Sequence, residues 1–174
     1  MRWQRNLLIF LAIVGLTACG SSSTTRQPAL QQLLWCSEPV LAFIDEGTVP
    51  ATMLPDWQAA KGSLGFTVTL PPTLPPQTCL ISAGTVTHDP VFGSRFSITY
   101  SLPDNQSLSI AESPQQQAIP KLQCSSTTGT DQIATTCQQT RDNVNITISG
   151  NQRVAQIQGL FPQLVPNVAW LPLH

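Results

Sequence analysis

The residues best suited to catalysis lie in one short segment that contains His88, Asp89 and Ser94. A histidine oriented by an aspartate can act as a general base, and a serine beside it can act as a nucleophile. Pro90 follows directly, however, and such a sequence is typical of a turn, which predicts an exposed loop. No G-x-S-x-G motif surrounds Ser94. We therefore expect a protein that is not an enzyme, with a hydrolase site near His88 as the alternative.

The other groups that could do chemistry are scattered along the chain. The carboxylates that could form a catalytic pair are Asp45, Glu46, Asp56 and Glu112. No spacing brings two of them together, so each is expected to be a solvated charge. His174 is the last residue and is expected to be frayed. The sequence has no metal-ligand spacing and no phosphate-binding glycine loop, so no cofactor and no metal are expected.

The first 18 residues have the pattern of a secretory signal peptide. Arg2 and Arg5 precede an apolar run from Leu7 to Ala18, which is shorter than the ~20 residues that a membrane-spanning helix needs. The run ends in the tetrad Leu-Thr-Ala-Cys at positions 16–19, which resembles the lipobox of bacterial lipoproteins. In that family the cysteine receives a diacylglyceryl group and becomes the new N-terminus. The resemblance implies that Cys19 carries palmitate-type acyl chains and anchors the protein to a membrane.

Residues 19–28 then form the lipidated cysteine and a small, polar, flexible tether. Residues 29–174 are expected to form one globular domain, because their number fits a single hydrophobic core. Such a protein would lie outside the cytoplasm on the cell membrane. The sequence leaves open whether the cell has an outer membrane and which membrane leaflet holds the anchor.

Four cysteines remain once Cys19 is assigned to lipid, and an even number in an exported chain suggests two disulfides. Cys124 and Cys137 flank a turn-rich segment, so a bridged hairpin is expected there. Cys36 and Cys79 then pair by elimination, although three pairings are possible in principle. A zinc site is disfavoured because the cysteines have no C-x-x-C spacing and no histidine beside them.

The charge of the chain argues against nucleic-acid partners. Charged residues make up only 10% of the sequence, and the formal net charge is −1. Removal of Arg2 and Arg5 with the signal peptide leaves six cations against nine anions, a net charge of −3. Nucleic-acid binding requires clustered cations. The partners left are a membrane, reached through the N-terminal lipid, and an envelope protein or an apolar ligand.

Helices are expected before the main sheet. Residues 29–34 could start a helix, and Ser37-Glu38-Pro39 reads as the start of a second one that ends at Gly47. Asp56 can cap a third, which begins at Trp57. Strand patterns follow, with apolar alternation over residues 66–70, 78–87 and 144–148 and a hairpin over residues 96–110.

A last helix is expected after Asn151, with Val154, Ile157 and Leu160 on one face. The fold class is therefore α+β. We expect an antiparallel sheet of about five to seven strands, short N-terminal helices, and a C-terminal helix packed on one face of the sheet. Trp35, Trp57, Trp170 and Tyr100 are expected to complete the core rather than to form a binding surface.

The segment WQAAKGSLGFTVTLPPTLPPQTCL, residues 57–80, is similar to the opening of the DUF4367-type domain. Residues 98–101 and 108–110 agree in order, and VNITISG at 144–150 resembles the closing strand of that family. The resemblance spans about residues 55–165. It implies an exported or membrane-tethered bacterial domain and assigns no catalytic residue.

These observations predict a lipid-anchored, non-catalytic protein of the bacterial cell envelope. It would be a binding or accessory module for a protein, a peptide or a lipid. Two alternatives stay open: an envelope hydrolase with a site near His88, and a purely structural spacer.

Overall fold

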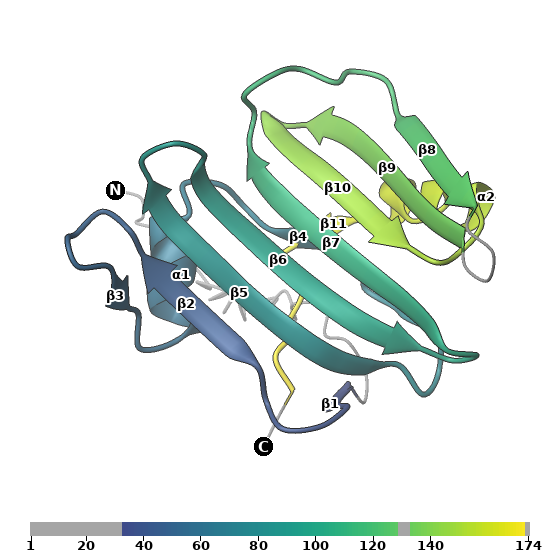
Figure 1. Cartoon of the computed structure of the whole chain (residues 1–174), viewed down its shortest axis with the longest axis horizontal. Helices are drawn as coiled ribbons and strands as arrows, with labels where there is room; N and C mark the ends of the chain where they lie inside the picture. The colour runs from purple at the N-terminus through teal and green to yellow at the C-terminus, as the bar shows by residue number, and fades with distance from the viewer. Residues whose placement is uncertain (1–32, 129–132, 173–174) are drawn as a thin grey trace, which may run out of the picture.

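One large β-sheet dominates the protein (Figure 1). The computed structural model describes residues 33–128 and 133–172. The sheet has nine strands, in the order β3-β2-β5-β6-β7-β10-β9-β8, with β1 also paired to β5. Its strands are β1 (Leu34–Trp35), β2 (Leu41–Asp45), β3 (Thr52–Met53), β5 (Cys79–Asp89), β6 (Gly93–Leu102), β7 (Gln106–Pro114), β8 (Gln123–Thr128), β9 (Ile133–Arg141) and β10 (Val144–Gly150).

The remaining elements are short. They are the helices α1 (Trp57–Ser63) and α2 (Val154–Gln158), a 3₁₀ turn over Phe161–Gln163, and a two-stranded ribbon of β4 (Thr69–Leu70) and β11 (Val165–Pro166). An α+β class fits this arrangement broadly. The sheet has more strands than the five to seven expected, and the described residues contain fewer helices.

The helix expected between Ser37 and Gly47 is wrong, because this segment contains β2. It pairs in parallel with β5, with Phe43 opposite Thr85, and Phe43 is only 6% exposed. Pairing along a long strand therefore overrides the local helix-start signal. Leu34 likewise lies in β1, whereas the preceding part of the expected helix at residues 29–34 lies mostly outside the described residues.

The central hairpin of β6 and β7 is confirmed, and its turn is made by Asp104 and Asn105, which both have positive φ. Strand β5 is also confirmed, but the side chains that it turns inward differ from those expected. A register shift between Leu80 and Ser82 marks a β-bulge, which moves the alternation by one residue. Ile81 was expected inside and is instead 38% exposed, while Leu80 and Ala83 are buried.

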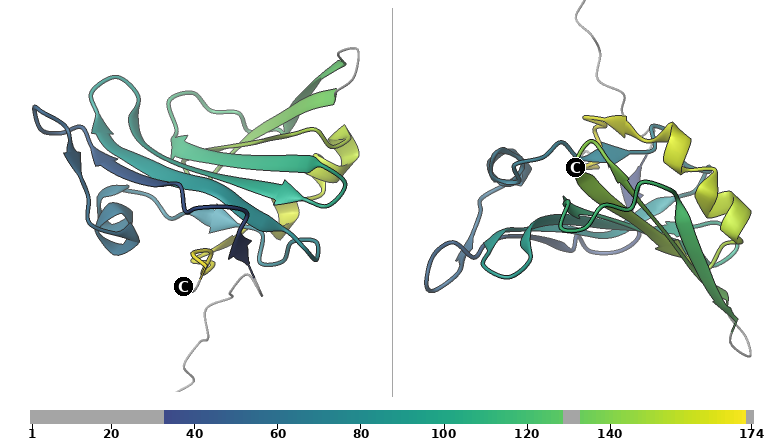
Figure 2. Two further views of the ribbon diagram at one scale, coloured as in Figure 1. Left: turned by 60° about the horizontal axis from the view of Figure 1, so that its bottom comes forward. Right: turned by 90° about the horizontal axis from the view of Figure 1, so that it is seen from above.

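Helices and the β4–β11 ribbon cover one face of the sheet. Among the described residues, no helix or strand lies over the opposite face, which we call the uncovered face (Figures 1 and 2). Helix α1, the β4–β11 ribbon, α2 and the C-terminal segment all lie on the covered face. Asp56 caps α1 as expected, by accepting a hydrogen bond from the Ala59 N–H at 2.9 Å. The strand expected over residues 66–70 is reduced to Thr69–Leu70.

Four aromatic rings fill the space beneath α1. The Trp57 ring centroid lies 6.2 Å from that of Phe43, 5.4 Å from that of Phe96 and 5.1 Å from that of Trp170. Trp170 and Tyr100 are fully buried, and Trp57 and Trp35 are partly buried against the core. The four clustered rings therefore join α1 and the C-terminal segment to the sheet.

Two disulfides hold the two sides of the sheet, Cys36–Cys79 and Cys124–Cys137. These are the two pairs suggested by the sequence. The Cα atoms are 5.0 Å apart in the first pair, which joins the chain after β1 to the start of β5. They are 4.1 Å apart in the second, which bridges opposite residues of β8 and β9. Disulfides are typical of an oxidising environment outside the cytoplasm.

Helix α2 is shorter than expected, and its start differs. It ends at Gln158, and Asn151 does not cap it, because the Asn151 side chain accepts a hydrogen bond from the Ser107 N–H at 2.8 Å. Ile157 is fully buried in the core. Val154 and Leu160 are only half-buried, so Ile157 is the one residue of the expected apolar face that is fully buried.

We expect Ile157→Ala to lower the free energy of unfolding by about 2–5 kcal/mol, through lost burial and the cavity left behind. Gln158→Ala, in the same helix but exposed, should change it by less than about 0.5 kcal/mol. Chemical denaturation of the full chain measures both values. Small and equal effects would mean that α2 does not pack on the sheet.

Candidate functional site

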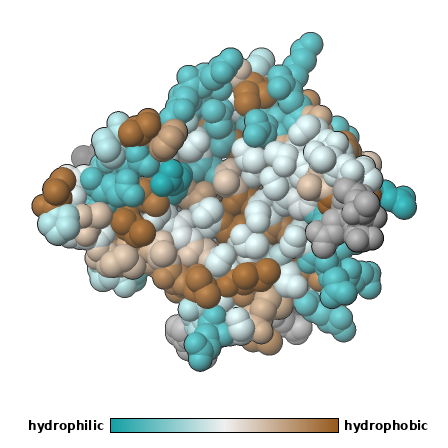
Figure 3. All heavy atoms as spheres, in the orientation of Figure 1, coloured by the Kyte–Doolittle hydropathy of each residue, from teal (hydrophilic) through white to brown (hydrophobic). Residues whose placement is uncertain are grey.

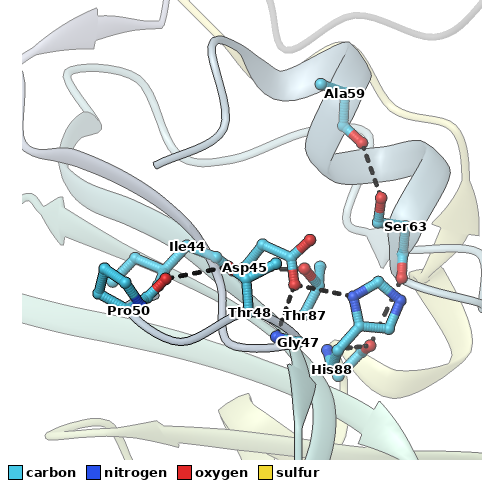
Figure 4. Close-up of polar contacts among 10 residues, drawn as sticks. Ile44, Asp45, Gly47, Thr48, Pro50, Ala59, Ser63, Thr87 and His88 are labelled. Atoms are coloured by element: carbon cyan, nitrogen blue, oxygen red, sulfur yellow. Dashed lines mark hydrogen bonds and ion pairs between the residues drawn. The ribbon is translucent and has the colours of Figure 1, made fainter. Parts of the chain in front are cut away.

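His88 contacts an aspartate, but not the one expected from the sequence (Figure 4). Its Nδ1 atom lies 2.9 Å from Oδ1 of Asp45, which comes from the neighbouring strand β2. The parallel pairing places Asp45 opposite Thr87 and so brings it beside His88. The Asp45 carboxylate also accepts the Gly47 N–H at 2.8 Å. Hydrogen bonding to His88, and then to Gly47, lowers the pKa of Asp45.

Asp89 does not orient His88, and Ser94 is not placed as a nucleophile beside it. Asp89 Oδ1 accepts the N–H groups of Val91 and Phe92, and hydrogen bonding, first to Phe92, lowers the pKa of Asp89. The Ser94 hydroxyl accepts the backbone N–H of His88 at 3.4 Å and donates to the Ser63 carbonyl at 3.5 Å. None of the described contacts joins this hydroxyl to the imidazole.

The arrangement around His88 is therefore a contact that closes a loop. The His88 side chain is 55% exposed, as the turn signal predicted. With Asp45 it joins the ends of β2 and β5 and fixes the chain that leads into the β2–β3 loop. A nucleophile held at the imidazole is what hydrolysis would require, and Ser94 does not occupy that place.

Glu112 is buried, although it was expected to be a solvated charge. It lies on β7, is 1% exposed, and points toward the covered face. Both of its carboxylate oxygens lie 3.1 Å from the Thr69 N–H, and one accepts the Thr69 hydroxyl at 2.7 Å. Burial raises the pKa of Glu112 to about 7, and the hydrogen bonds from Thr69 oppose this rise. Glu112 thus ties the β4–β11 ribbon to the middle of the sheet.

A pocket of about 630 Å³ lies beside this tie. The ribbon side contributes Thr69 and Pro166, and the β9–β10 side contributes Arg141, Asn143 and Ile146. Arg141 already donates to the Leu164 carbonyl at 3.2 Å, so its guanidinium is partly occupied. The carboxylate of Glu112 lies behind Thr69 and is not part of the pocket lining. The pocket has apolar and polar walls, and its lining includes Asp142, whose carboxylate lies 3.9 Å from Arg141 Nε.

A regular row of hydroxyl groups crosses the uncovered face of the sheet. It takes one serine or threonine from each of six neighbouring strands, β5, β6, β7, β10, β9 and β8. We call this set the hydroxyl row, and its members in spatial order are Ser82, Thr99, Ser109, Ser149, Thr136 and Ser125. Two neighbouring pairs are hydrogen-bonded at 3.0 Å, Thr99 with Ser109 and Thr136 with Ser149.

The row beside it is also uncharged, and most of its residues are small. It consists of Gly84, Ser97, Ala111, Thr147, Gln138 and Gln123 in the same strand order. Figure 3 shows many white and pale atoms in the middle of this face, with brown, hydrophobic atoms between them and in a band below them. The two rows form a polar surface, which we call the polar platform. It follows the twist of the sheet, which Figure 2 shows.

Gly84, in the second row, lies where two strands approach closely. A Cβ atom on Gly84 would lie 2.6 Å from the Ala42 carbonyl oxygen, so only glycine fits between β2 and β5 at this point. Sequence reasoning identified the apolar partners in these strands but gave no weight to the residues between them. The signal was present, because serine or threonine alternates with the buried residues of β6, β7 and β10.

Several expected features lie outside the described residues, including Cys19 and His174. Among the residues that the structure describes, no cluster of three or more His, Cys, Asp or Glu side chains could hold a metal ion. The helices within residues 33–128 and 133–172 are all too short or too polar to cross a membrane. No family model and no curated protein matches the chain, so the DUF4367-like resemblance stays a prediction.

The buried Glu112 predicts a specific pH dependence of stability. Its pKa rises from 4.5 to about 7 on folding, so the folded protein keeps a proton that the unfolded chain loses between these values. The contribution of Glu112 to the free energy of unfolding is fully present below pH 4.5. It is lost as the pH rises through 7, and the loss is about 3 kcal/mol at most. Asp45 and Asp89 act in the opposite sense, but only at more acidic pH.

We therefore expect the melting temperature of the native chain to fall between pH 5 and pH 8. Glu112→Gln, which stays neutral and can still accept hydrogen bonds from Thr69, should flatten this fall. Thermal unfolding of both proteins across that range measures the difference. Parallel curves for the two proteins would show that Glu112 does not titrate within the fold.

Proposed function

We propose that this protein is a lipid-tethered, non-catalytic binding module of the bacterial cell envelope, and that it binds through the uncovered face of its sheet. The observation that carries the proposal is the polar platform, in which the hydroxyl row crosses six strands. A sheet face that lies open to solvent can contact a partner without prior rearrangement. The lipobox-like residues 16–19 and the two disulfides support a place outside the cytoplasm.

Much of the opposite face is filled by the protein's own side chains. Ile157, Phe161, Leu164 and Trp170 are buried there between the sheet and the C-terminal segment. Lys61 donates to the Asn167 side chain at 3.0 Å and joins α1 to the C-terminal segment. A polar partner on the uncovered face is thus favoured over an apolar ligand between the layers.

The DUF4367-like assignment of residues 55–165 is part of this proposal. It is supported by the order of elements, in which α1 precedes the long strands and β10 precedes a final helix. A member of such a family would be exported or membrane-tethered, in agreement with a lipid on Cys19.

The tether is tested by replacing Cys19. We expect Cys19→Ser to release the protein from the membrane fraction and to abolish the mass added by the lipid, since the acylated thiol is lost. Cell fractionation and intact-mass measurement report these two changes. A variant that stays fully membrane-bound with an unchanged mass would contradict the proposal.

The binding face is tested by placing one charge on it. Ser109→Glu puts a carboxylate in the middle of the hydroxyl row, whereas Ser37→Glu puts the same charge on an exposed loop between β1 and β2. We expect crosslinks between the native chain and envelope components to be lost in the first variant and kept in the second. Loss in neither variant would mean that the uncovered face is not the contact surface.

A further inference from the structure

We infer that strand β8 is an interaction surface, and that it pairs with β8 of a second copy of this chain to form a twofold dimer. The inference concerns the edge of the sheet and goes beyond the proposed function. It is argued from the backbone groups that β8 turns away from β9, from the lack of features that block an edge, and from the symmetry of the strand.

The position of Cys124 shows which backbone groups of β8 face outward. Strand β8 ends the sheet and pairs with β9 alone among the described strands. The Cα atoms of Cys124 and of the opposite residue Cys137 are 4.1 Å apart. Opposite residues of antiparallel strands lie about 5.5 Å apart where they exchange hydrogen bonds and about 4.5 Å apart where they do not. The N–H and C=O groups of Cys124 therefore point away from β9.

Every second residue of β8 shares this orientation. The pairing with β9 runs from Gln123 to Thr128 without a register shift, so the backbone groups of Ser126 and Thr128 also point to the outer edge. The described backbone hydrogen bonds outside the strand ladders involve none of the residues 123–128. The edge thus offers a donor and an acceptor at each of these positions to another extended strand.

Strand β8 has none of the features that usually prevent edge pairing. Sheet edges are commonly protected by proline, by charged side chains, by bulges or by very short strands. The six residues of β8 include no proline and no charge, and their pairing has no bulge. On the other side of the sheet, β3 has only two residues, and Pro50 and Pro55 lie close to its ends. Of these two edges, β8 is the one that can accept a further strand.

The strand is held in place before any partner binds. The Cys124–Cys137 disulfide joins β8 to β9, and α2 packs beside β8. A preformed strand loses little conformational freedom on association. Helix α2 has no charged residue between Val154 and Gln158. Neither the strand nor the helix beside it therefore repels a second copy by its charge.

A second copy fits this edge because the outward-facing residues are symmetric about Ser126. In an antiparallel pair centred there, Ser126 meets Ser126 of the partner subunit, and Cys124 meets Thr128 of the partner subunit. The backbone groups of all these residues point outward, so each pair exchanges two hydrogen bonds. The side chains that meet are small and uncharged. The short edge β3 could not supply a matching strand, whereas β8 of another copy matches in length and in charge.

The test is disulfide trapping in the full-length chain, purified in detergent, with the variant Ser126→Cys. In the twofold pair the two Ser126 Cα atoms are about 5.5 Å apart, which a disulfide can bridge. Ser125→Cys is the matched control, because Ser125 is also exposed but lies opposite Thr127 of the partner subunit. Its two Cα atoms are then more than ~7 Å apart, too far for a disulfide. We expect oxidation by copper–phenanthroline to trap the Ser126→Cys dimer roughly tenfold faster than the control.

The dimer is also tested without a crosslink. Ser126→Lys places two like charges opposite each other at the centre of the pair and should abolish the dimer. Ser37→Lys, on the exposed loop between β1 and β2, should leave the dimer intact. Sedimentation equilibrium in density-matched detergent measures the mass of the native chain and of both variants. A native chain that is monomeric at the trapping concentration, a dimeric Ser126→Lys variant, or equal trapping of Ser126→Cys and Ser125→Cys overturns the inference.

Discussion

The alternation of side chains across the long strands is the constraint on which this protein depends. Each of β6, β7 and β10 sends apolar residues to one face and small hydroxyl residues to the other. The apolar face must be buried, although the described chain has only two short helices with which to cover it. The C-terminal segment completes the cover, with Trp170 packed against Trp57 and Phe96. Within the part of the chain that the structure describes, all covering helices and strands therefore lie on one side of the sheet (Figure 2).

The cover is held by a small number of specific contacts. Glu112 reaches from the sheet to Thr69 in the ribbon, and Arg141 reaches from β9 to the Leu164 carbonyl. Burial of the Glu112 carboxylate is unfavourable in free energy, because its charged form loses hydration. The same hydrogen bonds give the ribbon one defined position, which a purely apolar contact would not specify as sharply. The two disulfides hold the sheet at its outer strands and at β1.

The sequence predicts the elements whose signal is local. The hairpin of β6 and β7 and the cap of α1 at Asp56 were found because alternation, turn residues and capping residues lie close together in the chain. The strand β2 was missed because its partner β5 lies about 40 residues away, and the long pairing outweighs the helix-like start at Ser37. The burial of Glu112 has no local signal either, since Thr69 approaches it only in the folded chain. Asp45 joins His88 by the same long-range pairing.

The central claim is that the uncovered face is the working surface of the protein in the envelope. The most direct measurement is thiol labelling of a Ser109→Cys variant by a maleimide, in the purified protein and in an intact envelope preparation. The account predicts rapid labelling of the purified protein and protection in the envelope, where the ligand covers the hydroxyl row. A Ser37→Cys variant should label in both preparations. Equal labelling of Ser109→Cys in both would contradict the account.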